Sequence, residues 1–303
     1  MVQSKLVHFD EIRNNNFKSF LLFILFMMLI AGLGLLVGLI WGNLYFGLIL
    51  AVVFGFAYAL IAYFAGGNML MALAGAKPVT KKEYPHLYHT VEGLAIAAGV
   101  PTPKAYVIND PAPNAFATGR DPEHGAIAVT TGLLEKMNRE ELEGVVAHEM
   151  AHIKNYDIRS MMIAAIMVGV IILLSDFLLR SFIWGGMSGG GGGNRGGGPQ
   201  LILILVGIAL AILAPLIGEM IKLSISRKRE YAADARAAVL TRNPRGLANA
   251  LKKISQDPNE LRNTNKATAH LFISSPFRKK GFIRGLFSTH PPVGDRIKRL
   301  EAM

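Results

Sequence analysis

Long uncharged apolar segments dominate the first quarter of the chain. Residues 20–40 and 44–64 are mostly apolar, and only the short break at 41–43 separates them. A helix rises about 1.5 Å per residue, so each segment is long enough to cross the roughly 30 Å hydrocarbon core of a bilayer. No Asp, Glu, Lys or Arg occurs in the 58 positions between Lys18 and Lys77. The pattern predicts a transmembrane hairpin rather than a signal peptide, because the first run is too long and a second follows at once.

Two shorter apolar runs follow at residues 161–174 and 201–217. Runs of this length also fit a buried core helix or a re-entrant segment. We expect both to span, because their flanks can lengthen them. The connection between them, residues 185–198, has 10 glycines in 14 positions, and such a loop cannot bury a core. The sequence therefore predicts four transmembrane helices.

The distribution of charge predicts the orientation of these helices. Basic residues gather before the first run, after the second and after the fourth, whereas the glycine-rich loop holds Arg195 alone. Lys and Arg collect on the cytosolic side of membrane proteins, so both termini and the polar regions are expected in the cytosol, at the cell inner membrane. The net charge of +11 is explained in this way without nucleic acid. The flanking basic residues are Lys5, Arg13, Lys18, Lys77, Lys81, Lys82, Lys222, Arg227, Lys228, Arg229 and Arg236.

The polar region from 77 to 159 has the pattern of a mixed α/β unit. A helical pattern covers 83–98, and short strand patterns cover 105–109 and 127–130. Asn138 followed by Glu141 is typical of a helix start, and the helix is expected to run through residue 152. Residues 227–303 have a mainly helical pattern with long loops.

The predicted helix after Asn138 carries a metal-binding motif, His148-Glu149-Met150-Ala151-His152. Residues four apart share a helix face, so both imidazoles can bind one ion. Glu149 lies beside the first ligand, where it can take a proton from a zinc-bound water whose pKa is lowered towards about 7. The chain has no cysteine, so any transition metal must be held by His and carboxylate groups.

A catalytic zinc site needs a third protein ligand. Glu230 is the best candidate, and Asp234, one helical turn later, can hold a ligand imidazole from behind. His290 is the rival ligand. If the motif helix continued unbroken from His152 to Ser160, the metal would lie roughly 12 Å from the start of the third apolar run.

The chain resembles the HtpX family of membrane zinc endopeptidases, which are relatives of the CAAX prenyl protease. The resemblance rests on the N-terminal hairpin, HEMAH, the glycine-interrupted second hairpin, REYAADARA and STHPPVGDRI. It implies His148, His152 and Glu230 as ligands of one zinc ion per chain and Glu149 as the base. It further implies a role for Asp157 near the site, and contacts of His290 and Arg296 with the substrate carbonyl.

A short alternating segment precedes the motif helix. Asn114, Ala115, Phe116 and Ala117 form a potential edge strand that can pair with an extended substrate, although a plain surface strand fits the same pattern. The family resemblance favours the substrate-binding interpretation.

The predicted fold is therefore mainly α: a multi-pass membrane protein with a cytosolic zincin-type α+β metallopeptidase domain. The expected units are 1–76 (first hairpin), 77–159 (catalytic, with the motif helix), 160–222 (second hairpin) and 223–303 (catalytic, with the third ligand). The predicted activity is zinc-dependent hydrolysis of peptide bonds in membrane or unfolded proteins at the bilayer, and the resemblance adds quality control of damaged proteins under stress. The alternatives are a prenyl-protein processing protease and a non-enzymatic transporter.

Overall fold

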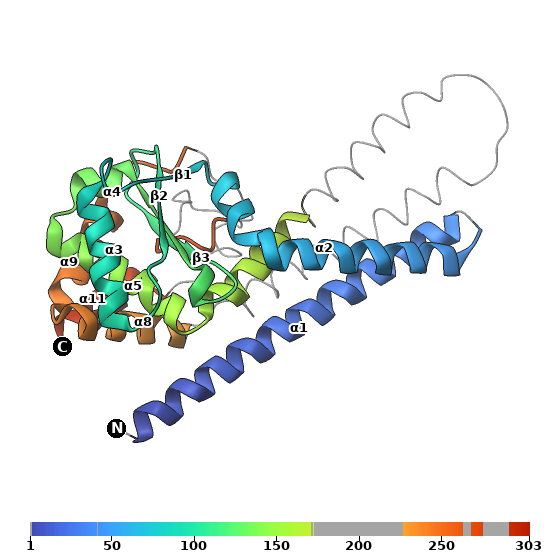
Figure 1. The fold of residues 1–303 in the computed structure, drawn as a ribbon, viewed down its shortest axis with the longest axis horizontal. Helices are drawn as coiled ribbons and strands as arrows, with labels where there is room; N and C mark the ends of the chain where they lie inside the picture. The colour runs from blue at the N-terminus through green and yellow to red at the C-terminus, as the bar shows by residue number, and fades with distance from the viewer. Residues whose placement is uncertain (1, 41, 171, 173–226, 263–267, 275–290) are drawn as a thin grey trace.

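A long helical hairpin and a compact α/β unit make up the chain (Figure 1). The structure, a computed structural model, describes all residues except 1, 41, 171, 173–226, 263–267 and 275–290. The fourth apolar run, the glycine-rich loop and His290 were predicted from the sequence and lie outside the described residues.

Helices α1 (Val2–Ile40) and α2 (Leu44–Leu73) form the predicted N-terminal hairpin. The side chain of Asn43 caps α2 by accepting a hydrogen bond from the Phe46 backbone N–H at 3.0 Å. The two helices approach closely at Gly34, where a Cβ atom would lie 2.3 Å from the Cβ of Ala51. Small residues permit this kind of backbone approach between membrane helices.

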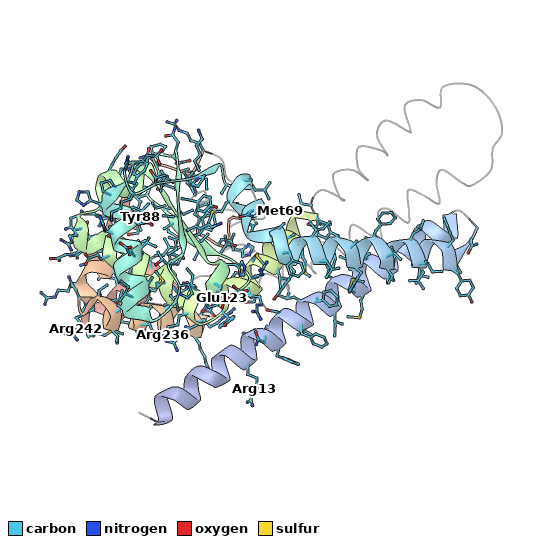
Figure 2. The ribbon with its side chains drawn as sticks, viewed as in Figure 1. Arg13, Met69, Tyr88, Glu123, Arg236 and Arg242 are labelled. Carbon is cyan, nitrogen blue, oxygen red and sulfur yellow. The ribbon has the colours of Figure 1, made fainter. Side chains whose placement is uncertain are left out.

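Both helices of the hairpin are long and apolar enough to cross a bilayer, over residues 16–35 and 44–73. Side chains project from both helices into the surroundings (Figure 2). Large apolar residues are among the exposed ones, including Phe54 at 69% exposure. Soluble monomers rarely expose apolar surface continuously in this way. The hairpin therefore indicates a membrane protein.

The α/β unit contains a four-stranded mixed sheet with the order β1-β2-β4-β3. β2 and β4 are parallel, and β1 and β3 pair antiparallel at the two edges. The predicted strands at 105–109 and 127–130 are confirmed, as is the edge position of the segment after Asn114, whereas β1 was not predicted. The strands are β1 (Ala76–Pro78), β2 (Lys104–Ile108), β3 (Ala115–Thr118) and β4 (Ala126–Thr130).

The two faces of the sheet contact different parts of the molecule. Side chains such as Ala117 and Val129 pack against the core formed with α3 (Pro85–Ala98) and α5 (Arg139–Lys154). The alternate side chains, such as Phe116, pack against the end of α2 and against residues 161–168. The sheet thus lies between the motif helix and the apolar helices. Apart from a helix at residues 157–170, the remaining described helices are η1 (Pro122–His124), α4 (Thr131–Lys136), α8 (Arg227–Thr241), α9 (Pro244–Gln256) and α11 (Val293–Glu301).

Helix α5 begins as predicted. Asn138 is its N-cap, and a capping box joins the Asn138 side chain to the Glu141 backbone and the Glu141 side chain back to Asn138. The helix is surrounded by β3, α3, α8 and α9. Its middle and end are therefore buried on nearly all sides.

The motif helix does not continue into the third apolar run. α5 ends at Lys154, Tyr156 has a φ of 60°, and a new helix covers residues 157–170. A non-glycine residue in the left-handed region breaks the helical path, so the estimate of 12 Å along one continuous helix was wrong. The new helix is buried at Met162, Ala165 and Val168.

Candidate metal centre

His148 and His152 lie on the same face of α5, as their spacing predicts. Both side chains are buried, with 1% and 3% exposure. Their Nε2 atoms are 3.2 Å apart, and the two rings are perpendicular with centroids 4.7 Å apart. The Nε2 lone pairs therefore converge on one point.

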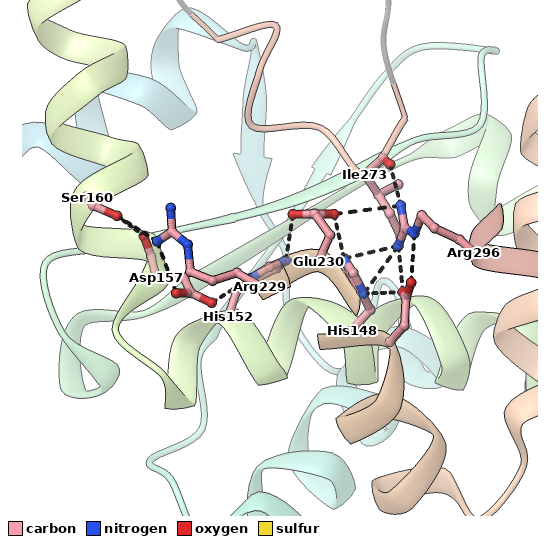
Figure 3. A network of polar contacts seen from close by, with 9 residues as sticks. His148, His152, Asp157, Ser160, Arg229, Glu230, Ile273 and Arg296 are labelled. Carbon is pink, nitrogen blue, oxygen red and sulfur yellow. Dashed lines mark hydrogen bonds and ion pairs between the residues drawn. The ribbon is translucent and has the colours of Figure 1, made fainter. Parts of the chain in front are cut away.

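Helix α8 brings Glu230 to the same point (Figure 3). Its Oε2 atom lies 3.7 Å from His148 Nε2, and its Oε1 atom lies 3.5 Å from His152 Nε2. Ligand atoms at tetrahedral angles and about 2.1 Å from a zinc ion are separated by about 3.4 Å. The three measured separations match this value, so the donor set fits a tetrahedral metal, and these three residues form a group that can hold an ion.

Each histidine is supported from behind by an aspartate. His148 Nδ1 lies 3.0 Å from Asp234 Oδ1, and His152 Nδ1 lies 3.0 Å from Asp157 Oδ2. With Nδ1–H donating to a carboxylate, each ring in its neutral form carries its lone pair on Nε2, which faces the common point. The structure thus places both predicted supporting residues, Asp234 and Asp157, next to the two histidines.

Arg296 of α11 lies in the same buried cluster with 0% exposure. Its Nε and one terminal nitrogen donate to the two oxygens of Asp234 at 2.9 and 2.7 Å, which is a bidentate pair. Another terminal nitrogen donates to the Ile273 carbonyl at 3.2 Å and lies 3.7 Å from Glu230. Arg296 thus lies at the site, with its side chain engaged by the protein. Its contact with a substrate carbonyl stays a prediction.

The described groups around the histidines carry a formal charge that suits a divalent cation. The four carboxylates and two arginines in the cluster leave a balance of −2, without counting Lys18, whose charge also acts on Asp157 and Arg229. A 2+ ion would neutralise it, and buried charge is costly unless it is compensated. The groups are Glu149, Asp157, Glu230, Asp234, Arg229 and Arg296.

The same charges shift the pKa values of the histidines in opposite directions. Burial and the neighbouring Arg296 lower the pKa of His148 to about 4. Burial would also lower the pKa of His152, but the hydrogen bond to Asp157 and the charge of Glu230 outweigh it and raise that pKa to about 9. The second histidine therefore lies where the field of the carboxylates favours a positive charge.

The predicted substrate strand β3 borders this cluster and is already in contact with a distant segment. The Ile273 N–H donates to the Ala115 carbonyl at 2.9 Å. The Asn114 side chain donates to the Ser274 carbonyl at 2.9 Å and accepts from the Ser274 N–H at 3.3 Å. At the start of β3, part of the outer edge is therefore occupied by residues 273–274.

Sequence reasoning did not identify Arg229, Ser160 or Ile273 as parts of the site. Arg229 contacts Asp157 and Ser160, and the Ile273 carbonyl accepts from Arg296 (Figure 3). The only local signal was that Arg229 precedes Glu230; nothing in the sequence pairs it with Asp157.

A helix-borne histidine pair, a glutamate from a second helix and an adjacent buried glutamate define a metallopeptidase site. Comparison with known proteins agrees with this class. The sequence model described as "Peptidase family M48" matches residues 81–303. The chain therefore belongs to peptidase family M48, whose members are metal-dependent, and it is a metalloprotease.

Curated relatives support the same assignment along nearly the whole chain. The "Protease HtpX homolog" of Listeria monocytogenes serotype 4a (strain HCC23) is 47% identical over 302 residues, covering 97% of this chain and 99% of the relative. The protein of the same name from Dictyoglomus thermophilum is 48% identical over 258 residues, covering 85% and 82%. The predicted resemblance to the HtpX family is confirmed.

A solved structure shares the fold. The crystal structure of S. mikatae Ste24p superimposes with a TM-score of 0.52 at 22% identity, covering 90% of this chain. The present chain spans 62% of the length of that protein. At this identity the likeness concerns the fold alone.

Proposed function

We propose that the protein is a zinc endopeptidase of the cell inner membrane, which hydrolyses peptide bonds of misfolded or damaged membrane proteins on the cytosolic side. The observation that carries the proposal is the convergence of His148, His152 and Glu230 at separations suited to a tetrahedral ion. The apolar helices pack on the opposite face of the sheet that borders this site.

The three converging side chains would hold one zinc ion per chain. Two imidazoles and one carboxylate are a donor set that catalytic zinc uses, with a further position left for water. The bound ion supplies a Lewis acid, which lowers the pKa of a coordinated water and polarises the scissile carbonyl. Asp234 and Asp157 fix the ring orientations of the two histidines through their Nδ1 hydrogen bonds.

Glu149 acts as the general base. It follows His148 directly on α5, and its side chain is 2% exposed. Its carboxylate accepts a proton from the attacking water as the water oxygen bonds to the carbonyl carbon. The same proton then passes to the amide nitrogen of the leaving group as the C–N bond breaks.

The substrate would lie as an extended chain along β3. Asn114, Ala115, Phe116 and Ala117 supply the strand, and backbone hydrogen bonds to a sheet edge accept many sequences, as a quality-control protease requires. Ala115 already bonds to Ile273, so a substrate would pair beyond that point or displace residues 273–274. His290 and Arg296 complete the catalytic group near the substrate carbonyl.

The chain would be organised as two hairpins and one divided catalytic domain. Residues 1–76 and 160–222 form the hairpins, and 77–159 and 223–303 together form the domain. The clustering of Lys and Arg at the ends of the apolar runs supports a cytosolic domain.

Casein cleavage by the full-length protein, purified in detergent with zinc, tests the proposal. Wild type should cleave casein and undergo self-cleavage. Glu149→Gln should retain zinc and lose at least about 10²-fold in rate, the scale of general-base loss. Wild-type turnover by Glu149→Gln would exclude the mechanism, and selective cleavage of a farnesylated C-terminal peptide would favour prenyl-protein processing instead.

A further inference from the structure

The two histidines of the metal centre have matching supports. Each imidazole donates from Nδ1 to a buried aspartate, and each aspartate also bonds to an arginine. Arg296 performs this role for Asp234, next to His148. Arg229 performs it for Asp157, next to His152.

Arg229 makes two hydrogen bonds from one terminal nitrogen. It donates to Asp157 Oδ1 at 3.2 Å and to the Ser160 hydroxyl at 3.1 Å. The other oxygen of Asp157 pairs with His152 at 3.0 Å, so one carboxylate connects the arginine to the imidazole. The Ser160 hydroxyl in turn donates to the Asp157 carbonyl at 3.0 Å, which fixes the backbone of the same turn.

These contacts join three segments that the metal centre needs. His152 belongs to α5, whereas Asp157 and Ser160 begin the helix at 157–170, after the break at Tyr156. Arg229 belongs to α8 and is followed at once by Glu230. Because the chain turns between His152 and Asp157, helical geometry does not fix their relative placement, and a cross-link from α8 can do so.

We propose that Arg229 is a positioning residue of the metal centre, which holds Asp157 against His152 and anchors the start of α8 so that Glu230 reaches the ion. This inference rests on the proposed zinc site. Asp157 is 1% exposed and the Arg229 side chain only 13%, so the pair is largely shielded from water. A buried carboxylate without its cation is costly, so Asp157 would shift when Arg229 is removed and would release the imidazole from its orientation.

Residues that bond directly to a metal ligand, as Asp157 does, typically contribute 10- to 100-fold to metal affinity. Because Arg229 acts through Asp157, we expect Arg229→Met, which keeps the unbranched apolar stem and removes the charge and donors, to weaken zinc binding by about 10-fold, the lower end of this range. Arg229→Lys keeps the charge and one donor nitrogen and should recover most of the loss. Lys228→Met is the matched control, because Lys228 is the exposed neighbour on the same helix.

The experiment measures zinc affinity of the full-length variants in detergent by competition with a chelating dye. The visible absorption of the cobalt-loaded protein is recorded in parallel, because its intensity and band positions report ligand geometry. Arg229→Met should change both readings, and Lys228→Met should change neither. Because Arg229 acts through Asp157, adding Arg229→Met to Asp157→Asn should cost little further affinity. The zinc affinity of the double variant should lie within about threefold of that of Asp157→Asn alone.

Three results would overturn the inference. First, Arg229→Met could match Lys228→Met in zinc affinity and in cobalt spectrum. Arg229 would then have a purely structural role, even if the thermal unfolding temperature of Arg229→Met in the presence of chelator is lowered. Second, the losses of zinc affinity caused by Arg229→Met and by Asp157→Asn could multiply in the double variant. Arg229→Lys could bind zinc as weakly as Arg229→Met. If Arg229→Met does not fold, Arg229→Gln replaces it under the same criteria.

One further variant separates this inference from the proposed function. His148→Ala should abolish zinc binding at micromolar concentrations. If it does and Arg229→Met has no effect, only the role of Arg229 is wrong. If His148→Ala binds zinc normally, the zinc site itself is wrong.

Discussion

Shortening Glu230 by one methylene group tests whether it is the third ligand. In Glu230→Asp the carboxylate retracts by roughly one C–C bond, about 1.5 Å. Its oxygen, which is expected about 2.1 Å from the ion, would then be about 3.6 Å away and out of bonding range. The free energy of zinc binding to structural sites with four ligands is about 10–16 kcal/mol, or about 2.5–4 kcal/mol per ligand. The substitution should therefore weaken zinc binding by about 10²- to 10³-fold.

The assay is a zinc titration of the full-length protein in detergent with a competing chelator, together with metal analysis after dialysis. Glu260→Asp is the matched control, because Glu260 is an exposed glutamate and its shortening should change nothing. Glu230→Gln keeps the length and a neutral oxygen, and it should lie between wild type and Glu230→Asp. If Glu230→Asp binds zinc within about threefold of the wild-type affinity, Glu230 is not the third ligand. If His290→Ala loses zinc instead, His290 is the third ligand.

Three further predictions concern stability, the metal and topology. A Cβ atom at Gly144 would lie 2.6 Å from the backbone of α9, whereas a Cβ atom at Gly93 would meet nothing within 4 Å. In a thermal melt, Gly144→Ala should therefore lower the unfolding temperature of the protein, and Gly93→Ala should raise it by about 1–4 °C. Chelation should abolish casein cleavage and added zinc should restore it, whereas activity that survives exhaustive chelation would contradict a metal mechanism. Tags at Met1, near residue 190 and at Met303 should report inside, outside and inside, and a protease-resistant tag near 190 in spheroplasts would show that the last two apolar runs do not span.

The parts of the site that the residue pattern alone predicted are those encoded locally, whereas Asp157, His290 and Arg296 came from the family resemblance. The two histidines and Glu149 occupy adjacent turns of one helix, and Asn138 and Glu141 mark its start within four residues. Glu230 and its neighbours share another helix in the same way. Helical periodicity fixes which of these side chains share a face, so one sequence is sufficient to group them.

What was missed is the set of contacts between distant segments. Arg296 and Asp234 are 62 residues apart, and Arg229 and Asp157 are 72 apart. Any of several buried carboxylates could attract an arginine, and only the packing of α8 on α5 and of α11 on α8 and α9 selects the pairs. The short strand β1 and the turn at Tyr156 were missed for a related reason, since three residues give no periodicity and tertiary packing alone stabilises a positive φ at a tyrosine.

The packing of the sheet predicts that the enzyme acts close to the bilayer. One face of the sheet holds α5 with the two histidines, and the other packs against α2 and residues 161–168. Glu230 follows the end of the fourth apolar run by 13 residues, which would cover roughly 20 Å if they were helical. A site held this close should prefer juxtamembrane segments.

The test uses one cleavable sequence in reconstituted vesicles, placed at increasing distance from a membrane anchor by a stiff spacer. The sequence should be cut fastest when it lies near the membrane. Equal rates at all distances, and for the free peptide, would show that attachment to the bilayer does not select substrates.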